Sequence, residues 1–442
     1  MGSQHPKISK PPTAGEAERI IRRDIEIMAR SYRKLFPLAV KSVEGSIVED
    51  VNGNRYIDFT ANSGTLLLGG RHPLILQAIK EQVERFASYS LTTVYCEEAV
   101  ELAEELSKIA PIRGDVRIIF TNSESEAVDA AVRALNWHTG KSVILSFLGA
   151  KHGSTMKGLQ LSSDSREKRQ AVKIENVLYA PSPRCSRCML GLSFEKCEFK
   201  CLDYSRRIAE ALAPDELSII LFEPIQVEAG VVVPPEGYLE RLTHSAKSMG
   251  ALSVADESYT APARTGRWFT LDYWNVKVDA VCLGAQLSSG LPLGALIARE
   301  DLLDLEPGMY ESLTGGCQIS ISAALATLRA IKEEGLIERS ERIGRSVMKR
   351  IRDILEELEL SWEVRGLGML IGIEIIDESG SPMEKLAREL VEECFRIGLL
   401  IRRRRESIIL SPALNIEEEI LEKGLEILET KISELSRLSQ VF

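Results

Sequence analysis

Five short apolar segments of the chain are each followed by polar residues of types that could bind a ligand. The segments are Val116–Phe120, Val143–Phe147, Ser218–Phe222, Ala251–Ala255 and Ala280–Leu283. Helical stretches separate them, and fully apolar strands that alternate with helices are typical of a parallel sheet covered on both faces. In such a sheet a ligand lies at the carboxyl ends of the strands. We therefore expect the residues after these segments to form one site.

The polar runs that follow the segments differ in chemistry. In order they are Thr121–Ala127, Gly149–Thr155, Glu223–Gly230, Asp256–Glu257 with Arg264–Gly266, and Gly284–Ala295. The first run opens a helix, and Ser123 and Ser125 lie at its start. A serine there is most often a helix cap, whereas a helix start can also bind phosphate.

Taken in order, these runs resemble the class III aminotransferases, a family of pyridoxal phosphate (PLP) enzymes of fold type I. The resemblance covers nearly the whole chain and includes the runs Asp50–Asp58, Gly69–Pro73, Arg365–Met369 and Ser411–Leu414. It implies an α/β fold of the type I PLP-dependent transferases, with a large domain built on a mainly parallel sheet. A smaller α+β domain would be formed from both chain ends. The family also implies a homodimer, because each cofactor site is completed by the partner subunit.

The resemblance implies a site in which one position departs from the family. The family binds PLP through a lysine that lies about thirty residues after the aspartate that pairs with the pyridine nitrogen. The aspartate is Asp256, but the lysine position holds Gln286. An amide nitrogen is not nucleophilic and cannot form a Schiff base. The resemblance therefore implies no catalytic residue at 286 and only vestigial cofactor contacts, which would be Ser123, Ser125, His152, Glu228 and Asp256.

Further departures surround the same ligand. Glu124 replaces the glycine of the phosphate loop, and Lys151 replaces the aromatic residue that stacks on the pyridine ring. The other replacements are Tyr259 for a glutamine, Ala261 and Ala263 for two glycines, and Leu313 for the threonine that reaches the partner's phosphate. These changes predict a non-catalytic homologue, a pseudoenzyme without PLP. It would act as a dimeric binding or regulatory protein on a paralogue or a ribonucleoprotein.

Several alternatives stay open. The chain could be a PLP-dependent class III aminotransferase acting on an amino acid, with residue 286 substituted naturally or by engineering. The amino form of the cofactor could bind without covalent attachment. Lys151 could also form the Schiff base that Gln286 cannot form.

Four of the eight cysteines are clustered within seventeen positions. They are Cys185, Cys188, Cys197 and Cys201, and two close pairs suit a four-thiolate zinc or iron–sulfur site. Four thiolates leave no open coordination position, so the role would be structural. Two local disulfides or reduced thiols are the alternatives. The other four, Cys96, Cys282, Cys317 and Cys394, lie among apolar neighbours and are predicted to be small buried hydrophobes.

A run of four arginines, Arg402 to Arg405, precedes a predicted strand at Ile408–Leu410. Charged residues on a solvated edge discourage pairing with other chains. The alternative is a surface for an acidic partner such as RNA or an acidic protein patch. The candidate partner-binding residues are therefore Arg402, Arg403, Arg404 and Arg405.

The composition limits the classes of protein to which the chain can belong. The chain has 442 residues, of which 44% are hydrophobic and 27% charged, and a net charge of -10. The apolar fraction excludes a disordered chain, and no apolar run approaches the ~20 residues of a membrane helix. The polar N-terminal segment resembles no signal peptide, so we expect a cytoplasmic protein without a membrane partner. Abundant Glu, Arg and Ile favour a heat-adapted source.

The pattern of helices and strands predicts four segments. A flexible tail would cover 1–14, the first part of the small domain 15–74, the large domain 75–326 with a cysteine-rich insert at 181–204, and the rest of the small domain 327–442. Within the small domain we expect a helix over Ala17–Leu35, a hairpin over Ile47–Phe59 and a long helix over Thr327–Leu360. Strands at Trp362–Val364 and Met369–Ile376, a helix over Pro382–Ile397 and one from Ile416 would follow.

Overall fold

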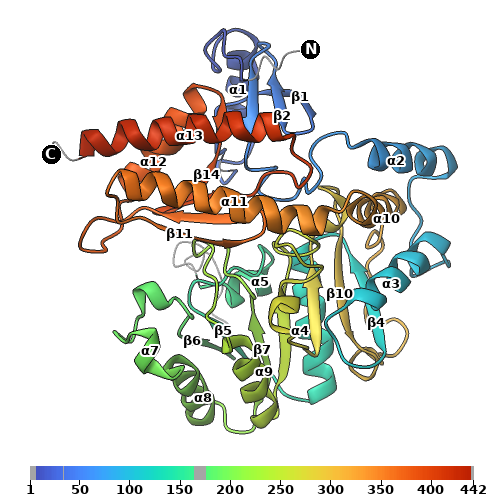
Figure 1. Ribbon diagram of the computed structural model, residues 1–442. Coiled ribbons are helices and arrows are strands. Elements are labelled where there is room, and N and C mark those ends of the chain that lie inside the picture. The colour runs from blue at the N-terminus through green and yellow to red at the C-terminus, as the bar shows by residue number, and fades with distance from the viewer. Residues whose placement is uncertain (1–5, 33, 164–175, 440–442) are drawn as a thin grey trace. The chain divides into compact units, whose positions relative to one another are not determined.

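A computed structural model describes residues 6–32, 34–163 and 176–439 (Figure 1). The chain divides into two compact units: one joins residues 1–73 and 342–442, and the other comprises Leu74–Glu341. The sequence placed the second boundary at residue 326, whereas the structure places it within a helix. In the described part of the chain no helix is long and apolar enough to cross a membrane.

The larger unit is built on a seven-stranded sheet with the strand order β4-β10-β9-β8-β7-β5-β6. The strands are β4 (Val116–Thr121), β5 (Val143–Phe147), β6 (Val177–Ala180), β7 (Leu217–Phe222), β8 (Leu252–Asp256), β9 (Ala280–Leu283) and β10 (Gly294–Arg299). Pairing is parallel from β6 through to β9, and β10 runs antiparallel to both β9 and β4. The predicted mainly parallel sheet is confirmed.

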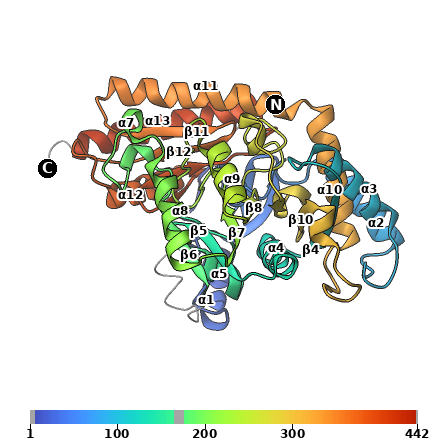
Figure 2. The ribbon, with the colours of Figure 1, turned by 90° about the horizontal axis from the view of Figure 1, so that it is seen from below.

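Helices cover both faces of this sheet (Figure 2). The helices of the larger unit are α2 (Pro73–Arg85), α3 (Glu97–Ile109), α4 (Glu124–Thr139), α5 (Met156–Leu161), α7 (Phe194–Cys197), α8 (Lys200–Leu212), α9 (Tyr238–Ser248) and α10 (Gln318–Glu333). Short 3₁₀ turns are η1 (Cys185–Arg187), η2 (Thr270–Trp274), η3 (Ala285–Ser288) and η4 (Glu300–Leu303).

Alternate strand residues enter two separate cores, as the period of two in a strand requires. Leu145 and Ile220 pack in the core that contains α3, α8, α9 and α10, whereas Ile144 and Ile219 pack in the core that contains α4. The small residues of α4 that lie against the sheet are Ala127, Ala130, Ala131 and Ala134. Because both faces are buried, the carboxyl ends of the strands remain as the place for polar groups.

The smaller unit contains two four-stranded sheets, ordered β1-β2-β3-β13 and β11-β12-β15-β14. Its strands are β1 (Val40–Glu44), β2 (Ile47–Asp50), β3 (Arg55–Asp58), β11 (Glu363–Leu367), β12 (Leu370–Glu374), β13 (Leu399–Leu400), β14 (Arg402–Arg404) and β15 (Ser407–Leu410). Its helices are α1 (Glu16–Ile27), α12 (Glu384–Arg396) and α13 (Glu418–Ser439), and α11 (Leu336–Glu357) lies almost wholly within it.

Two expected helices are wrong in extent. The helix expected over Ala17–Leu35 ends at Ile27, because Ala17 is the buried residue of α1 while Ile25 and Ile27 are exposed. A helix draws most of its stability from packing, and here little packing supports a longer one. The helix expected over Thr327–Leu360 is two helices, because Gly335 adopts φ 59° between α10 and α11. A left-handed glycine ends a helix.

Candidate functional site

Buried polar side chains meet at the carboxyl ends of β5, β7, β8 and β9. His152 follows β5 and is 1% exposed, and its Nδ1 lies 2.8 Å from Oδ2 of Asp256, the last residue of β8. The other carboxylate oxygen of Asp256 accepts hydrogen bonds from Ser258 N at 3.1 Å and Ser258 Oγ at 2.5 Å. Both oxygens of Asp256 are therefore held in a fixed orientation.

Gln286 is joined to this group through Ser258. The 286 side chain lies in η3, is 1% exposed, and donates from Nε2 to the Ser258 carbonyl oxygen at 3.2 Å. Its Oε1 accepts from Nε of Arg264 at 3.5 Å, and Arg264 is fully buried. Both ends of the amide are thus engaged within the protein, in a series that runs from His152 to Arg264.

Two buried glutamates flank Asp256, and they differ in their surroundings. Glu223, which follows β7, accepts from Lys151 N at 3.0 Å through Oε2. Burial, and then the charge of Asp256, raises the pKa of Glu223 well above its usual value. Burial also raises the pKa of Glu257 to about 7, although Glu257 accepts hydrogen bonds from Thr260 Oγ, Thr270 N and Leu271 N. Glu257 therefore anchors the start of η2.

The start of α4 lies beside the turn that carries Gln286. Ser123 is the N-cap, with its Oγ accepting from Glu126 N at 3.3 Å, so the cap interpretation holds for Ser123. Ser125 Oγ accepts from Ser154 N at 2.9 Å. A Cβ placed on Gly284 would lie 3.1 Å from Glu124 Cβ and 3.2 Å from Ser258 O. Glu124 thus approaches the β9–η3 turn closely.

Some residues of the site were predicted from the sequence, and others were not. His152, Asp256 and Gln286 are brought together, and the charge of Glu228 acts on Glu223, so Glu228 lies near the group. Ser258 and Arg264 were not predicted as site residues. The position of Ser258 two residues after β8 was the available signal for it.

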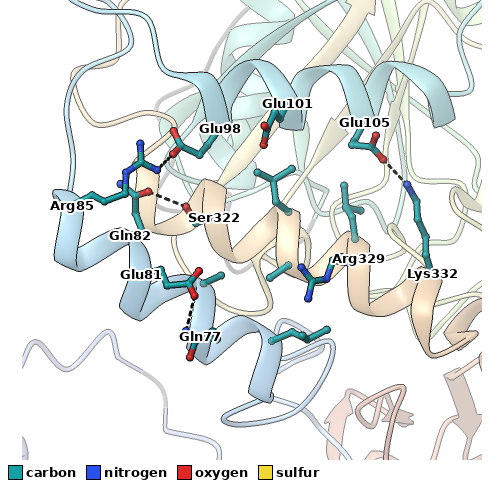
Figure 3. A pocket seen from close by; sticks show the side chains of 15 residues that line it. Gln77, Glu81, Gln82, Arg85, Glu98, Glu101, Glu105, Ser322, Arg329 and Lys332 are labelled. Carbon is teal, nitrogen blue, oxygen red and sulfur yellow. Dashed lines mark hydrogen bonds and ion pairs between the residues drawn. The ribbon is translucent and has the colours of Figure 1, made fainter.

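A separate hollow of about 670 Å³ lies among α2, α3 and α10 (Figure 3). Among the charged side chains that line it, Arg85 pairs with Glu98 and Lys332 pairs with Glu105. Gln82 accepts from Ser322 Oγ at 3.3 Å across the same space. The hollow is formed by outer helix faces and contains none of the residues at the strand ends.

Three comparisons relate this chain to known proteins. The family model of the class III aminotransferases matches residues 27–432. The chain belongs to the class III aminotransferase family. It is 33% identical to the alanine/serine racemase of Pyrococcus horikoshii over 98% of this chain and 93% of that protein. It is 31% identical to the acetylornithine aminotransferase of Archaeoglobus fulgidus over 92% of this chain and 99% of that protein.

The fold agrees with this membership. The crystal structure of the omega transaminase of Pseudomonas jessenii in complex with PMP has a TM-score of 0.89 at 24% identity, and the match covers 95% of this chain and 98% of that one. The predicted type I PLP-transferase fold is confirmed, and class III aminotransferases are PLP-dependent enzymes.

The predicted pseudoenzyme function is wrong. Relatives that match this chain over nearly its full length are aminotransferases and racemases of amino acids, which supports a PLP-dependent amino-acid enzyme over a non-catalytic homologue. The buried His152–Asp256 pair is also intact. The relatives give no support to the predicted absence of PLP, or to a paralogue or ribonucleoprotein as partner.

The arginine run forms an edge strand. Arg402–Arg404 make up β14, which pairs antiparallel with β15 at the end of its sheet. Arg402 is buried, whereas Arg405 is exposed in a turn with φ 51°. This placement suits the interpretation as a charged edge, and partner binding by Arg402 to Arg405 stays a prediction.

The four clustered cysteines lie outside the strand-end site. Cys185 begins η1, Cys188 follows it, Cys197 ends α7 and Cys201 lies in the first turn of α8. All four are free thiols. In the described residues no group of three or more potential ligands is arranged to hold a metal ion, so metal binding at these cysteines stays a prediction.

Proposed function

We propose that the protein is an amino-acid enzyme of the class III family that uses PLP bound at the carboxyl end of β8. The observation that supports this most is the buried pair of His152 and Asp256, with both carboxylate oxygens held. A carboxylate fixed in this way can stabilise a protonated pyridine nitrogen. The side chains of the site therefore fit the ring of the cofactor.

The same site does not fit a covalent bond at residue 286. The amide of Gln286 cannot act as a nucleophile, and its two ends bind the Ser258 carbonyl and Arg264. We infer that the cofactor is held non-covalently, through its ring at Asp256 and its phosphate near the start of α4. Glu124, in the first turn of α4, weakens the phosphate contact by like charge.

The residues of the site have different roles in the reaction. PLP supplies the electron sink for breaking a bond at the α-carbon of an amino acid. Asp256 holds the proton on the pyridine nitrogen, and His152 orients Asp256. Gln286 cannot carry a proton between atoms of the substrate. We assign that role to Lys151, which is anchored through its backbone to Glu223 directly beside His152.

We propose α-amino acids as the substrates and transamination as the reaction. The alanine/serine racemase of Pyrococcus horikoshii and the leucine/methionine racemase of Thermococcus litoralis, 31% identical over 95% of this chain, favour racemisation as a second candidate. Both reactions begin by removing the proton from the α-carbon, so they share a first requirement for a base.

Cofactor binding can be measured on the full chain. The protein is incubated with PLP, treated with borohydride, dialysed and analysed by mass spectrometry. We expect PLP to saturate the protein before dialysis and to be removed by it, with no mass added. A stable adduct on Lys151 would contradict non-covalent binding, and a protein that PLP never saturates would contradict the proposed function.

The reaction is tested by incubating the PLP-loaded protein with single L- and D-amino acids and 2-oxoglutarate. Transamination yields glutamate, and racemisation yields the opposite enantiomer on chiral chromatography. We expect glutamate from at least one α-amino acid and loss of this activity in Lys151→Met. Activity unchanged in Lys151→Met would show that the proton is moved by another group.

A further inference from the structure

Four free thiols surround one small cavity at the surface of the larger unit. Cys185, Cys188, Cys197 and Cys201 all line it, and its volume is about 20 Å³. A cavity of about 10–15 Å³ holds one water molecule, so this space is large enough for a single ion. We propose that these four cysteines bind one zinc ion as thiolates.

The local backbone brings the two pairs together. Cys185 and Cys188 are the first residue of η1 and the residue after its end. Between Cys197 and Cys201, Glu198 and Phe199 both adopt left-handed conformations, with φ 46° and 60°. Two consecutive non-glycine residues in this region are costly and mark sites where the surrounding structure demands a special geometry. Here the turn directs Cys197 and Cys201 to the same cavity.

All four cysteines of the cluster line the same small cavity. A divalent cation bound in that cavity stabilises thiolates over thiols, because its charge opposes theirs.

A buried hydroxyl independently points to an acceptor at this place. Tyr238, at the start of α9, is 2% exposed, and its hydroxyl has no hydrogen-bond partner within the described residues. Its ring packs against that of Phe199, in the turn between Cys197 and Cys201, with the ring centroids 6.2 Å apart. A buried donor without an acceptor is destabilising. A metal-bound thiolate provides the acceptor, in the way that outer hydrogen bonds support metal ligands.

The surroundings favour zinc and a structural role. The cavity has space for one ion but not for a four-iron cluster. Arg184 and Lys200 line it as well, and positive groups favour deprotonated thiols. The exchange is balanced: one Zn²⁺ binds, four thiols release four protons, and the net charge of the centre becomes -2. Because the four thiols are not arranged as a metal site in the described residues, binding requires their side chains to rotate toward the ion.

Cobalt and zinc titrations of the full chain, reduced and freed of metal, test this proposal. We expect one equivalent of Co²⁺ per chain with sulfur-to-cobalt charge-transfer and tetrahedral ligand-field bands, displaced by one equivalent of Zn²⁺. Cys185→Ser should remove the bands. Tyr238→Phe should keep them and weaken zinc binding about 10- to 100-fold. Cys317→Ser, a change at a thiol outside the cluster, is the matched control and should leave both unchanged.

Three results would overturn the proposal. One is the absence of cobalt bands in the reduced wild-type protein, including the case in which the four cysteines form two disulfides on oxidation. Another is a Cys317→Ser protein that loses the bands as Cys185→Ser does. The third combines two findings. Without metal, Cys185→Ser unfolds at a much lower temperature than the wild type, and zinc does not raise the unfolding temperature of the wild type.

Discussion

At the scale of single residues, the site is a continuous series of buried hydrogen bonds. It runs from His152 through Asp256 and Ser258 to Gln286 and Arg264. The glutamine is an integral part of this series, since both of its polar atoms have protein partners. A lysine at 286 would meet the same carbonyl oxygen of Ser258 and a guanidinium.

Replacing Asp256 by Asn should weaken PLP binding with little effect on folding. The carboxylate pairs with a charged ring nitrogen, and a hydrogen bond to a charged group contributes about 1.5–3 kcal/mol, or roughly 10- to 100-fold in affinity. Equilibrium dialysis measures the affinity for PLP. Asp129→Asn, at a partly buried carboxylate that accepts from Thr155 Oγ at 2.9 Å, is the control and should bind PLP as the wild type does.

Glu257 should make the stability of the protein depend on pH. Its pKa is raised from 4.5 to about 7 in the folded state. A raised carboxyl pKa means that the folded state keeps a proton that the unfolded state has lost, so stability is full below pH 4.5 and falls as pH rises to about 7. The slope in that window is about 1.4 kcal/mol per pH unit.

Glu257→Gln removes this titration. The glutamine loses an acceptor toward Thr270 N or Leu271 N, which lowers stability by about 1–3 kcal/mol at low pH. Urea unfolding from pH 5 to 8 should show the wild type losing its advantage over the variant as pH rises. A difference that is the same at every pH would show that Glu257 is ionised throughout.

At the scale of elements, much of the fold could be predicted because burial leaves a direct mark on sequence. Strands β5, β7, β8 and β9 are short runs of mostly apolar residues, and their alternation with helices indicates parallel pairing. The antiparallel β10 was missed, because Gly294–Arg299 follows a glycine-rich turn and strand direction leaves no mark on composition.

The site was harder to predict than the sheet. The ends of the strands named His152 and Asp256, whereas Ser258 joins Gln286 through its backbone carbonyl, which carries no side-chain signal. The role of Arg264 depends on its complete burial next to residue 286, which is a tertiary contact. Spacing could find the cysteine cluster because its members are close in sequence.

Helix α11 should depend on the absence of a side chain at Gly344. A Cβ there would lie 1.8 Å from the carbonyl oxygen of Gly368. Gly344→Ala should lower the free energy of unfolding by about 1–3 kcal/mol through overpacking, measured by urea unfolding. Lys349→Ala, on the exposed side of the same helix, should change it little. Equal values for the two variants would show that the backbone moves apart at no cost.

At the scale of the whole molecule, we expect a homodimer, as the family resemblance implies. Tyr95, Tyr89 and Leu313 are apolar residues of the larger unit with exposed fractions of 103%, 56% and 72%. Large exposed apolar groups are typical of interaction surfaces. Tyr95→Asp should shift the wild-type dimer to monomer in sedimentation experiments. Leu212→Asp, at an exposed leucine at the end of α8, is the control and should leave the dimer intact. A dimer that survives Tyr95→Asp would show that the interface lies elsewhere.

The central claim is that this chain is a working member of its family despite Gln286. The most direct measurement compares the PLP-dependent formation of glutamate from amino acids by the wild type and by Gln286→Lys. We predict a measurable rate for the wild type and a higher one for the variant, because Arg264 beside the new amine lowers its pKa and favours the nucleophilic form. Absence of turnover in both proteins, with PLP bound, would contradict the account.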